Sequence, residues 1–179
     1  PFVYIAALEN GWTQSDKILD APAIYQHTRP GQYWSPENYD KEFYGEVPLR
    51  LALMKSMNVA TVKLMEKVGS KKVLDVSRRF GITSKLEPFW SLALGSYDMN
   101  LLELTSAYAA LANGGVRHKA LFIRQVLDRE GALREEGVPE EGEATTPTVS
   151  YLITNMLKAA VQEGTGWHVG KNLGRPAAG

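Results

Sequence analysis

The triplet Ser56-Met57-Asn58 places a hydroxyl and a carboxamide two residues apart, at the joint between two predicted helices. Both groups can donate and accept hydrogen bonds, so together they could orient a polar ligand or pass a proton. This joint is therefore the first candidate site in the chain.

The helix before the joint is predicted from the spacing of its side chains. After Pro48, which suits a first helical turn, residues recur at i, i+3, i+4 and i+7: Leu49, Ala52, Leu53 and Ser56. The pattern predicts that Ser56 continues the buried face of this helix. A buried hydroxyl without a partner costs about 1–3 kcal/mol, so Ser56 would need a hydrogen bond there.

A structural interpretation of the triplet stays open at this point. Asn58 could cap the following helix, because asparagine is among the preferred N-cap residues. Ser56 could bond back to the backbone of its own helix, as serine often does. The two interpretations predict different partners for the same side chains.

Other residue types that carry chemistry are sparse. The three histidines, His27, His118 and His168, lie far apart without an i, i+4 pair, a spacing that does not favour a metal site. The chain has no cysteine, which excludes disulfides and thiolate ligands. Five glutamates fall within residues 135–143, where glycine and proline indicate an exposed linker. We predict no metal and no cofactor.

Periodicity and stop signals predict a mostly helical chain. The expected helices, in order, cover residues 2–9, 49–56, 58–68, 70–80, 101–111 and 147–161. Thr146 is expected to cap the last of them, with Pro147 in its first turn. A short hairpin is predicted from residues 122–128 and 132–134. After Gly164-Thr165-Gly166 we expect no further element.

Residues 10–48 are expected to form one long irregular segment, because prolines and glycines interrupt every periodic pattern there. Five aromatic side chains gather in its second half: Tyr33, Trp34, Tyr39, Phe43 and Tyr44. Large aromatic residues are usually buried, so these could attach the loop to the helices. They could instead line a cleft.

The composition suits one globular domain without nucleic-acid contacts. Of the 179 residues, 44% are hydrophobic, which is enough for one core. Twenty basic and twenty acidic residues give a net charge of zero, so nothing draws the chain toward nucleic acid. No apolar run approaches the ~20 residues of a membrane helix, and we expect any anchor in other parts of a longer protein.

Several stretches resemble, in the right order, the transpeptidase domain of class A penicillin-binding proteins. They are Trp34-Ser35-Pro36-Glu37-Asn38-Tyr39-Asp40, Phe43-Tyr44-Gly45, Leu49-Arg50 to Ser56-Met57-Asn58, Leu92-Ala93-Leu94-Gly95, Leu102-Glu103-Leu104-Thr105-Ser106-Ala107-Tyr108 through Asn113-Gly114-Gly115, and Gly164-Thr165-Gly166 with Arg175-Pro176. Each motif alone is weak, but together they cover nearly the whole chain. The resemblance implies an α+β, predominantly α fold: the helical part of a penicillin-binding (β-lactamase-like) transpeptidase domain with a short β-hairpin, partial over residues 1–179.

The resemblance also implies roles for single residues. Ser56 and Asn58 would be the catalytic residues of the Ser-x-Asn motif. Ser56 would pass a proton to the leaving group between two lysines, and Asn58 would hold the acyl-amide of the substrate. Trp34 and Thr165 would contact the substrate. The implied partners are peptidoglycan stem peptides and β-lactam antibiotics, at the extracytoplasmic face of the bacterial membrane.

The other two motifs of the family do not occur within the 179 residues. These are Ser-x-x-Lys, which carries the acylated serine, and Lys-Thr-Gly. In relatives they flank a segment like this one, so we expect both ends of the chain to lie at motif edges. Without a nucleophile we expect the chain alone to be inactive. The alternative is a non-catalytic module, either a helical interaction domain or a β-lactam-sensing relative of the same fold.

Overall fold

The computed structural model describes residues 1–26 and 31–179, and helix α1 (Phe2–Glu9) lies at its centre. Every residue from Val3 to Leu8 is buried. A helix that is apolar on all sides has to be enclosed by other elements, and α1 is packed in this way. The phenol of Tyr4 reaches Thr61 through a 2.8 Å hydrogen bond, so its one polar atom is also satisfied.

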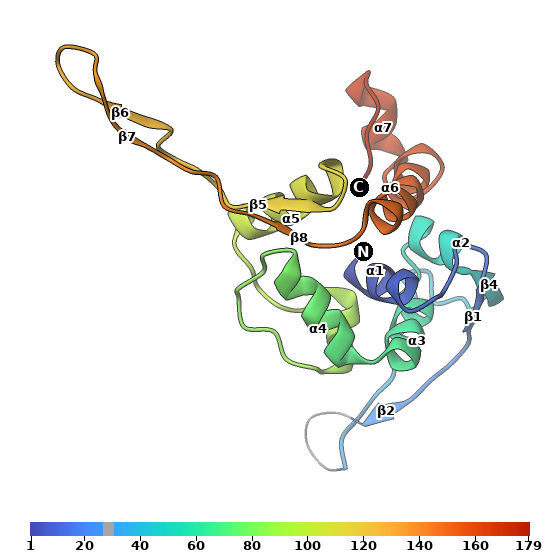
Figure 1. Ribbon diagram of the computed structural model, residues 1–179. Coiled ribbons are helices and arrows are strands. Elements are labelled where there is room, and N and C mark those ends of the chain that lie inside the picture. The colour runs from blue at the N-terminus through green and yellow to red at the C-terminus, as the bar shows by residue number, and fades with distance from the viewer. Residues whose placement is uncertain (27–30) are drawn as a thin grey trace.

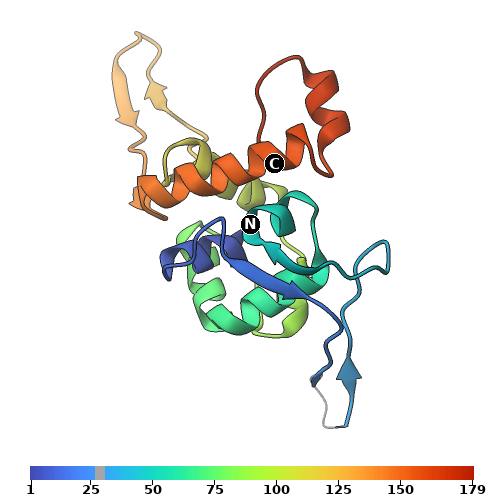
Figure 2. The same ribbon diagram turned by 90° about the vertical axis from the view of Figure 1, so that its right-hand side faces the viewer.

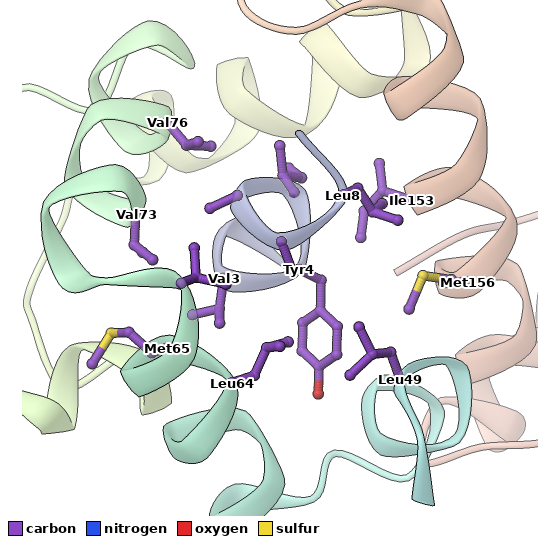
Figure 3. Packing of buried hydrophobic residues seen from close by; sticks show 14 of the residues in the cluster. Val3, Tyr4, Leu8, Leu49, Leu64, Met65, Val73, Val76, Ile153 and Met156 are labelled. Carbon is purple, nitrogen blue, oxygen red and sulfur yellow. The ribbon is translucent and has the colours of Figure 1, made fainter. Parts of the chain in front are cut away.

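Three predicted helices surround α1, as Figures 1 and 3 show: α3 (Asn58–Val68), α4 (Ser70–Arg79) and α6 (Pro147–Gln162). Their apolar faces meet the central helix from different sides. Leu64 and Met65 come from α3, and Ile153 and Met156 come from α6. One continuous core results.

The helix boundaries follow the signals in the sequence closely. At the start of α6 the hydroxyl of Thr146 accepts a hydrogen bond from the Val149 amide at 3.3 Å, with Pro147 in the first turn, so the predicted cap is confirmed. Asn100 caps α5 (Leu101–Ala112) in the same manner. Helix α2 (Leu49–Met54) is shorter than predicted.

The segment expected to be irregular contains two strand pairs, and this expectation was wrong in part. Strand β1 (Lys17–Asp20) pairs with β4 (Gly45–Pro48), antiparallel, with Ile18 opposite Val47. Strand β2 (Tyr25–Gln26) pairs with β3 (Tyr33–Trp34). These strands are two to four residues long, too short for their alternation to stand out among the prolines and glycines.

The predicted hairpin is confirmed, and it projects from the body of the molecule (Figures 1 and 2). It consists of β6 (Gln125–Leu127) and β7 (Leu133–Glu136), and all residues of both strands are exposed. The expected acidic linker is not wholly irregular, because β8 (Glu141–Glu143) pairs with β5 (Val116–His118) at the base of this hairpin.

Two helical elements were missed from the sequence. The 3-10 helix η1 (Trp90–Leu94) packs beside α3, and α7 (Trp167–Leu173) packs against α6, where no further element was expected. The apolar residues of α7 remain exposed, so its sequence lacks a buried stripe that periodicity could detect. In the part of the chain that the structure describes, no helix is long and apolar enough to cross a membrane.

Candidate active site

Ser56 lies in a tight helix ending between α2 and α3. Its backbone is left-handed, with φ of 54°, and its amide donates to the Leu53 carbonyl at 3.0 Å. The next amide, from Met57, reaches the Ala52 carbonyl at 2.9 Å. These two bonds form a Schellman motif, in which the left-handed position is usually occupied by glycine. A side chain at this position is strained by about 1–2 kcal/mol.

The prediction that Ser56 continues the buried face of its helix was wrong. Helix α2 ends at Met54, so the turn rotates Ser56 out to the surface, and Ser56 is exposed. Within the described part of the chain its hydroxyl makes no hydrogen bond to another protein atom. The structural interpretation therefore fails for Ser56, because the hydroxyl does not bond back to its own helix.

Asn58 does not cap α3 either. Met57 occupies the N-cap position without a side-chain hydrogen bond, and the Asn58 Nδ2 atom donates instead to the Glu37 carbonyl at 2.9 Å. A carbonyl oxygen only accepts, so the amide nitrogen has to face Glu37 and the Asn58 Oδ1 atom faces away from it. The carboxamide is thus held in one orientation at the beginning of α3.

Ser56 and Asn58 open into one cavity of about 710 Å³. Its lining also includes Thr165, so the structure brings together three of the four residues that the sequence singled out. The remaining lining residues are Asn38, Tyr39, Asp40, Tyr44, Leu51, Lys55 and Met57. The cavity thus combines hydroxyl, amide, carboxylate and ammonium groups at the ends of several elements.

Thr165 reaches this cavity because the chain after α6 passes very close to the end of α2. The Thr165 amide donates to the Met54 carbonyl at 3.3 Å, and Lys55 Nζ donates to the Glu163 carbonyl at 3.3 Å. A Cβ atom on Gly164 would stand 2.1 Å from the Met54 oxygen, so only glycine fits between them. Gly164 therefore fixes the approach of Thr165.

Trp34 does not line this cavity, contrary to the expectation that it contacts the same ligand. It lies in β3 opposite Tyr25, with ring centroids 6.3 Å apart, and the Tyr25 ring also packs at a tilt against Trp90, with ring centroids 4.8 Å apart. The Tyr25 hydroxyl donates to Glu66, which is eight residues, or about 12 Å, farther along α3 than Asn58. The β2–β3 hairpin thus carries Trp34 toward the other end of α3.

The loop that carries the five aromatic residues (33–44, the aromatic loop) contributes a charged side chain, Asp40, to the cavity lining. The Tyr44 hydroxyl donates to the Asp40 carboxylate, and this bond, aided by a backbone bond from Glu42, lowers the pKa of Asp40 below its ordinary value. The same contact raises the pKa of Tyr44. Asp40 therefore stays ionised at neutral pH and faces the same cavity as Lys55.

No cluster of three or more histidine, aspartate or glutamate side chains suited to a metal ion occurs among residues 1–26 and 31–179. His27, one of the histidines considered from the sequence, lies outside the described residues. The His118 Nδ1 atom lies 3.8 Å from the Glu141 Oε2 atom across the β5–β8 pair, and neither residue lines the cavity.

Comparisons with known proteins identify the family and the fold of the chain. A family model described as the penicillin binding protein transpeptidase domain matches residues 1–179. Penicillin-binding protein 1A of Aquifex aeolicus is 41% identical over 92% of this chain, which spans 23% of that protein. The solved penicillin-binding protein 1A from Haemophilus influenzae superposes with a TM-score of 0.87 at 26% identity, over 98% of this chain and 32% of that one.

A more distant structure shares the fold alone: penicillin-binding protein A from M. tuberculosis, solved as an imipenem acyl-enzyme complex, has a TM-score of 0.78 at 24% identity, over 90% of this chain and 42% of that one. The fold is therefore that of an α+β, β-lactamase-like transpeptidase domain. The chain belongs to the penicillin-binding protein transpeptidase family, among relatives of class A. It spans about a quarter of the length of the curated relatives that it matches.

Proposed function

We propose that this chain is the part of a peptidoglycan DD-transpeptidase that carries the Ser-x-Asn side of the active site. The complete enzyme would crosslink stem peptides at the extracytoplasmic face of the membrane and would be acylated by β-lactams. The family membership supports this function, and so does the acyl-enzyme of the M. tuberculosis relative. The sequence contains neither Ser-x-x-Lys nor Lys-Thr-Gly, so we expect the chain alone to be inactive.

One observation carries the assignment of Ser56. A serine occupies a left-handed position that glycine would occupy with less strain; Ser56 lines the cavity, and its hydroxyl has no protein partner among the described residues. Backbone strain that is retained at an exposed polar residue is typical of functional sites. The hydroxyl, rather than the fold, therefore accounts for serine at this position.

The proposed roles follow from the positions of the groups. Ser56 would accept and release the proton that moves to the leaving group. Asn58, oriented by the Glu37 carbonyl, would present its Oδ1 atom to the amide N–H of a stem peptide or β-lactam. Thr165, which lines the same cavity, would donate to a polar group of the same ligand. Trp34 has no part in this proposal, because it lies away from the cavity.

The test requires a complete domain, meaning residues 1–179 placed between the Ser-x-x-Lys and Lys-Thr-Gly segments of the family. In that protein Ser56→Ala should lower the second-order rate of acylation by penicillin about 10²–10⁴-fold, as expected for loss of a proton relay. The unfolding midpoint should hardly change, because the hydroxyl bonds to no protein atom in the described residues. Ser96→Ala, an exposed serine outside the cavity, is the matched control and should change neither quantity.

The alternative function is a non-catalytic module of the same fold, which would sense β-lactams or bind a partner. It predicts that the natural gene lacks Ser-x-x-Lys before residue 1 and Lys-Thr-Gly after residue 179. An unchanged acylation rate with a lowered unfolding midpoint would make Ser56 a structural residue.

A further inference from the structure

A buried polar pair, Asp20 and Asn38, lies at the wall of the cavity, which Asn38 helps to line. Asp20, at the end of β1, has no exposed surface, and Asn38 is only 6% exposed. The Asn38 Nδ2 atom donates to Asp20 Oδ1 at 3.1 Å and to Asp20 Oδ2 at 2.9 Å. The Tyr44 amide also donates to Asp20 Oδ2, at 2.9 Å. Because a buried carboxylate needs several donors, this pair holds the loop around Asn38 firmly on β1.

The other end of the Asn38 side chain reaches α3. Its Oδ1 atom accepts a 3.2 Å hydrogen bond from the Val59 amide, one of the first-turn amides that a helix leaves without an internal partner. The N-cap residue, Met57, provides no side-chain bond, so Asn38 acts as the cap from a distant loop. Its Nδ2 atom also donates to the Glu42 carbonyl at 2.9 Å, so both ends of its carboxamide are engaged.

The same loop orients the side chain of the motif. The carbonyl that accepts from Asn58 belongs to Glu37, the residue immediately before Asn38. The position of Asn38 relative to α3 therefore sets both the first backbone turn of the helix and the direction of the Asn58 carboxamide. A shift of the Asn38 side chain would be transmitted to Asn58 through one peptide unit.

We propose that Asn38, held by Asp20, is a positioning residue of the transpeptidase site, which acts through the Glu37 carbonyl and the Val59 amide on the orientation of Asn58. The inference rests on the proposed function of Asn58. It adds two residues outside the Ser-x-Asn motif, and it assigns them an effect on the reaction through geometry and not through contact with the reacting atoms.

The decisive variants exchange the groups within the pair. Asn38→Asp sets two carboxylates against each other and removes the donor to Asp20, while it keeps an acceptor for the Val59 amide. The double variant Asp20→Asn with Asn38→Asp restores a donor and a carboxylate in reversed order, and it keeps acceptors for the Tyr44 and Val59 amides, but it has no donor for the Glu42 carbonyl. Asn172→Asp, at an exposed position of α7, is the matched control for the added charge.

Three quantities are measured in the complete domain: the second-order acylation rate with penicillin, the unfolding midpoint, and the NMR signals of the Asn58 side-chain amide and the Val59 backbone amide. Asn38→Asp should shift both signals and slow acylation roughly 10²-fold, since misplacement by about 1 Å has effects of this size. The double variant should recover part of the rate and move both signals back toward the parent, and Asn172→Asp should match the parent. If Asn38→Asp does not fold, Asn38→Ser takes its place.

A purely structural role predicts another result. The midpoint would fall, acylation per folded molecule would stay the same, and the Asn58 signal would not move; that result, or a folded double variant without recovery, overturns the inference. Asn58→Ala in the same assay separates this failure from failure of the proposed function. If Asn58→Ala slows acylation and Asn38→Asp does not, only the positioning role is wrong. If Asn58→Ala leaves acylation unchanged, the role of Asn58 itself is wrong.

Discussion

The core around α1 and the turn at Ser56 each contain a hydroxyl group, but the two groups differ in burial and in hydrogen bonding. In the core, the Tyr4 hydroxyl is buried and bonded to Thr61 at 2.8 Å, and burial raises the pKa of Tyr4 far above its ordinary value. At the turn, the Ser56 hydroxyl is exposed to the cavity, and its backbone is strained. The core satisfies its polar groups internally, whereas the turn leaves one available to a ligand.

The difference teaches where stability and chemistry reside in this chain. Burial of apolar surface by α1 and its neighbours supplies the stability, and we propose that the polar ends of α2, α3 and α6 supply the reacting groups. A substitution in the core should therefore act on folding, and one at the turn should act on the reaction. The three predictions that follow test this separation, from the largest effect to the smallest.

A core variant should lower stability without a specific effect on the site. Ile5 is fully buried in α1, so Ile5→Ala in the complete domain should lower the free energy of unfolding by about 2–5 kcal/mol. Acylation per folded molecule should stay close to that of the parent. Denaturant unfolding and the acylation rate measure both quantities, and Leu101→Ala, at a side chain that is 79% exposed, is the control. If Ile5→Ala slowed acylation per folded molecule without lowering stability, core and site would not be separate in this way.

The turn itself should show the reverse relation. Ser56→Gly and Ser56→Ala both remove the hydroxyl, but only glycine relieves the left-handed strain at this position. We expect the glycine variant to be more stable than the alanine variant by about 1 kcal/mol, and both to acylate equally slowly. Equal unfolding free energies would mean that the backbone of Ser56 is not strained.

The third prediction concerns a hydrogen-bonded carboxylate outside the cavity, which should affect stability and not acylation. Glu103, in the first turn of α5, accepts hydrogen bonds from Ser84 and Thr83, which lower its pKa to about 2. A depressed pKa in the folded state means that this carboxylate stabilises the fold above its ordinary pKa, near 4.5, and that the contribution is lost as the pH falls toward 2.

The unfolding midpoint should therefore decrease between pH 4.5 and pH 2, and Glu103→Gln should flatten that decrease. The effect should be modest, because the carboxylate is exposed to solvent. Acylation at neutral pH should not change, since Glu103 does not line the cavity. If the unfolding midpoint of the glutamine variant decreases just as steeply between pH 4.5 and pH 2, other groups control this decrease.

Much of the fold could be predicted because its signals are local. Apolar spacing and caps located α3, α4, α5 and α6, and α1 was recognised as a helix from only a few residues. The strand pair β1–β4 joins segments more than twenty residues apart, and neither strand has a distinctive pattern alone. Periodicity therefore detects long helices well and short paired strands poorly.

The site was predicted only in part, for the same reason. The motif located Ser56 and Asn58, but a Schellman ending without glycine gives no sequence signal, so Ser56 was placed on the wrong face. The sequence left two roles open for the aromatic residues of the loop, attachment by their rings or lining of a cleft; Tyr39 is fully exposed and Tyr33 is 72% exposed, and Tyr39 and Tyr44 line the cavity. The Asp20–Asn38 pair holds the loop, across 18 residues of sequence, a separation that no local pattern reveals.

The central claim is that residues 1–179 supply one side of a β-lactam-reactive site and not the nucleophile. Intact-mass measurement after incubation with a labelled penicillin tests it most directly. We predict no adduct on residues 1–179 alone and one adduct per molecule on the complete domain. A stoichiometric covalent adduct on residues 1–179 alone, or a folded complete domain that forms none, would contradict the account.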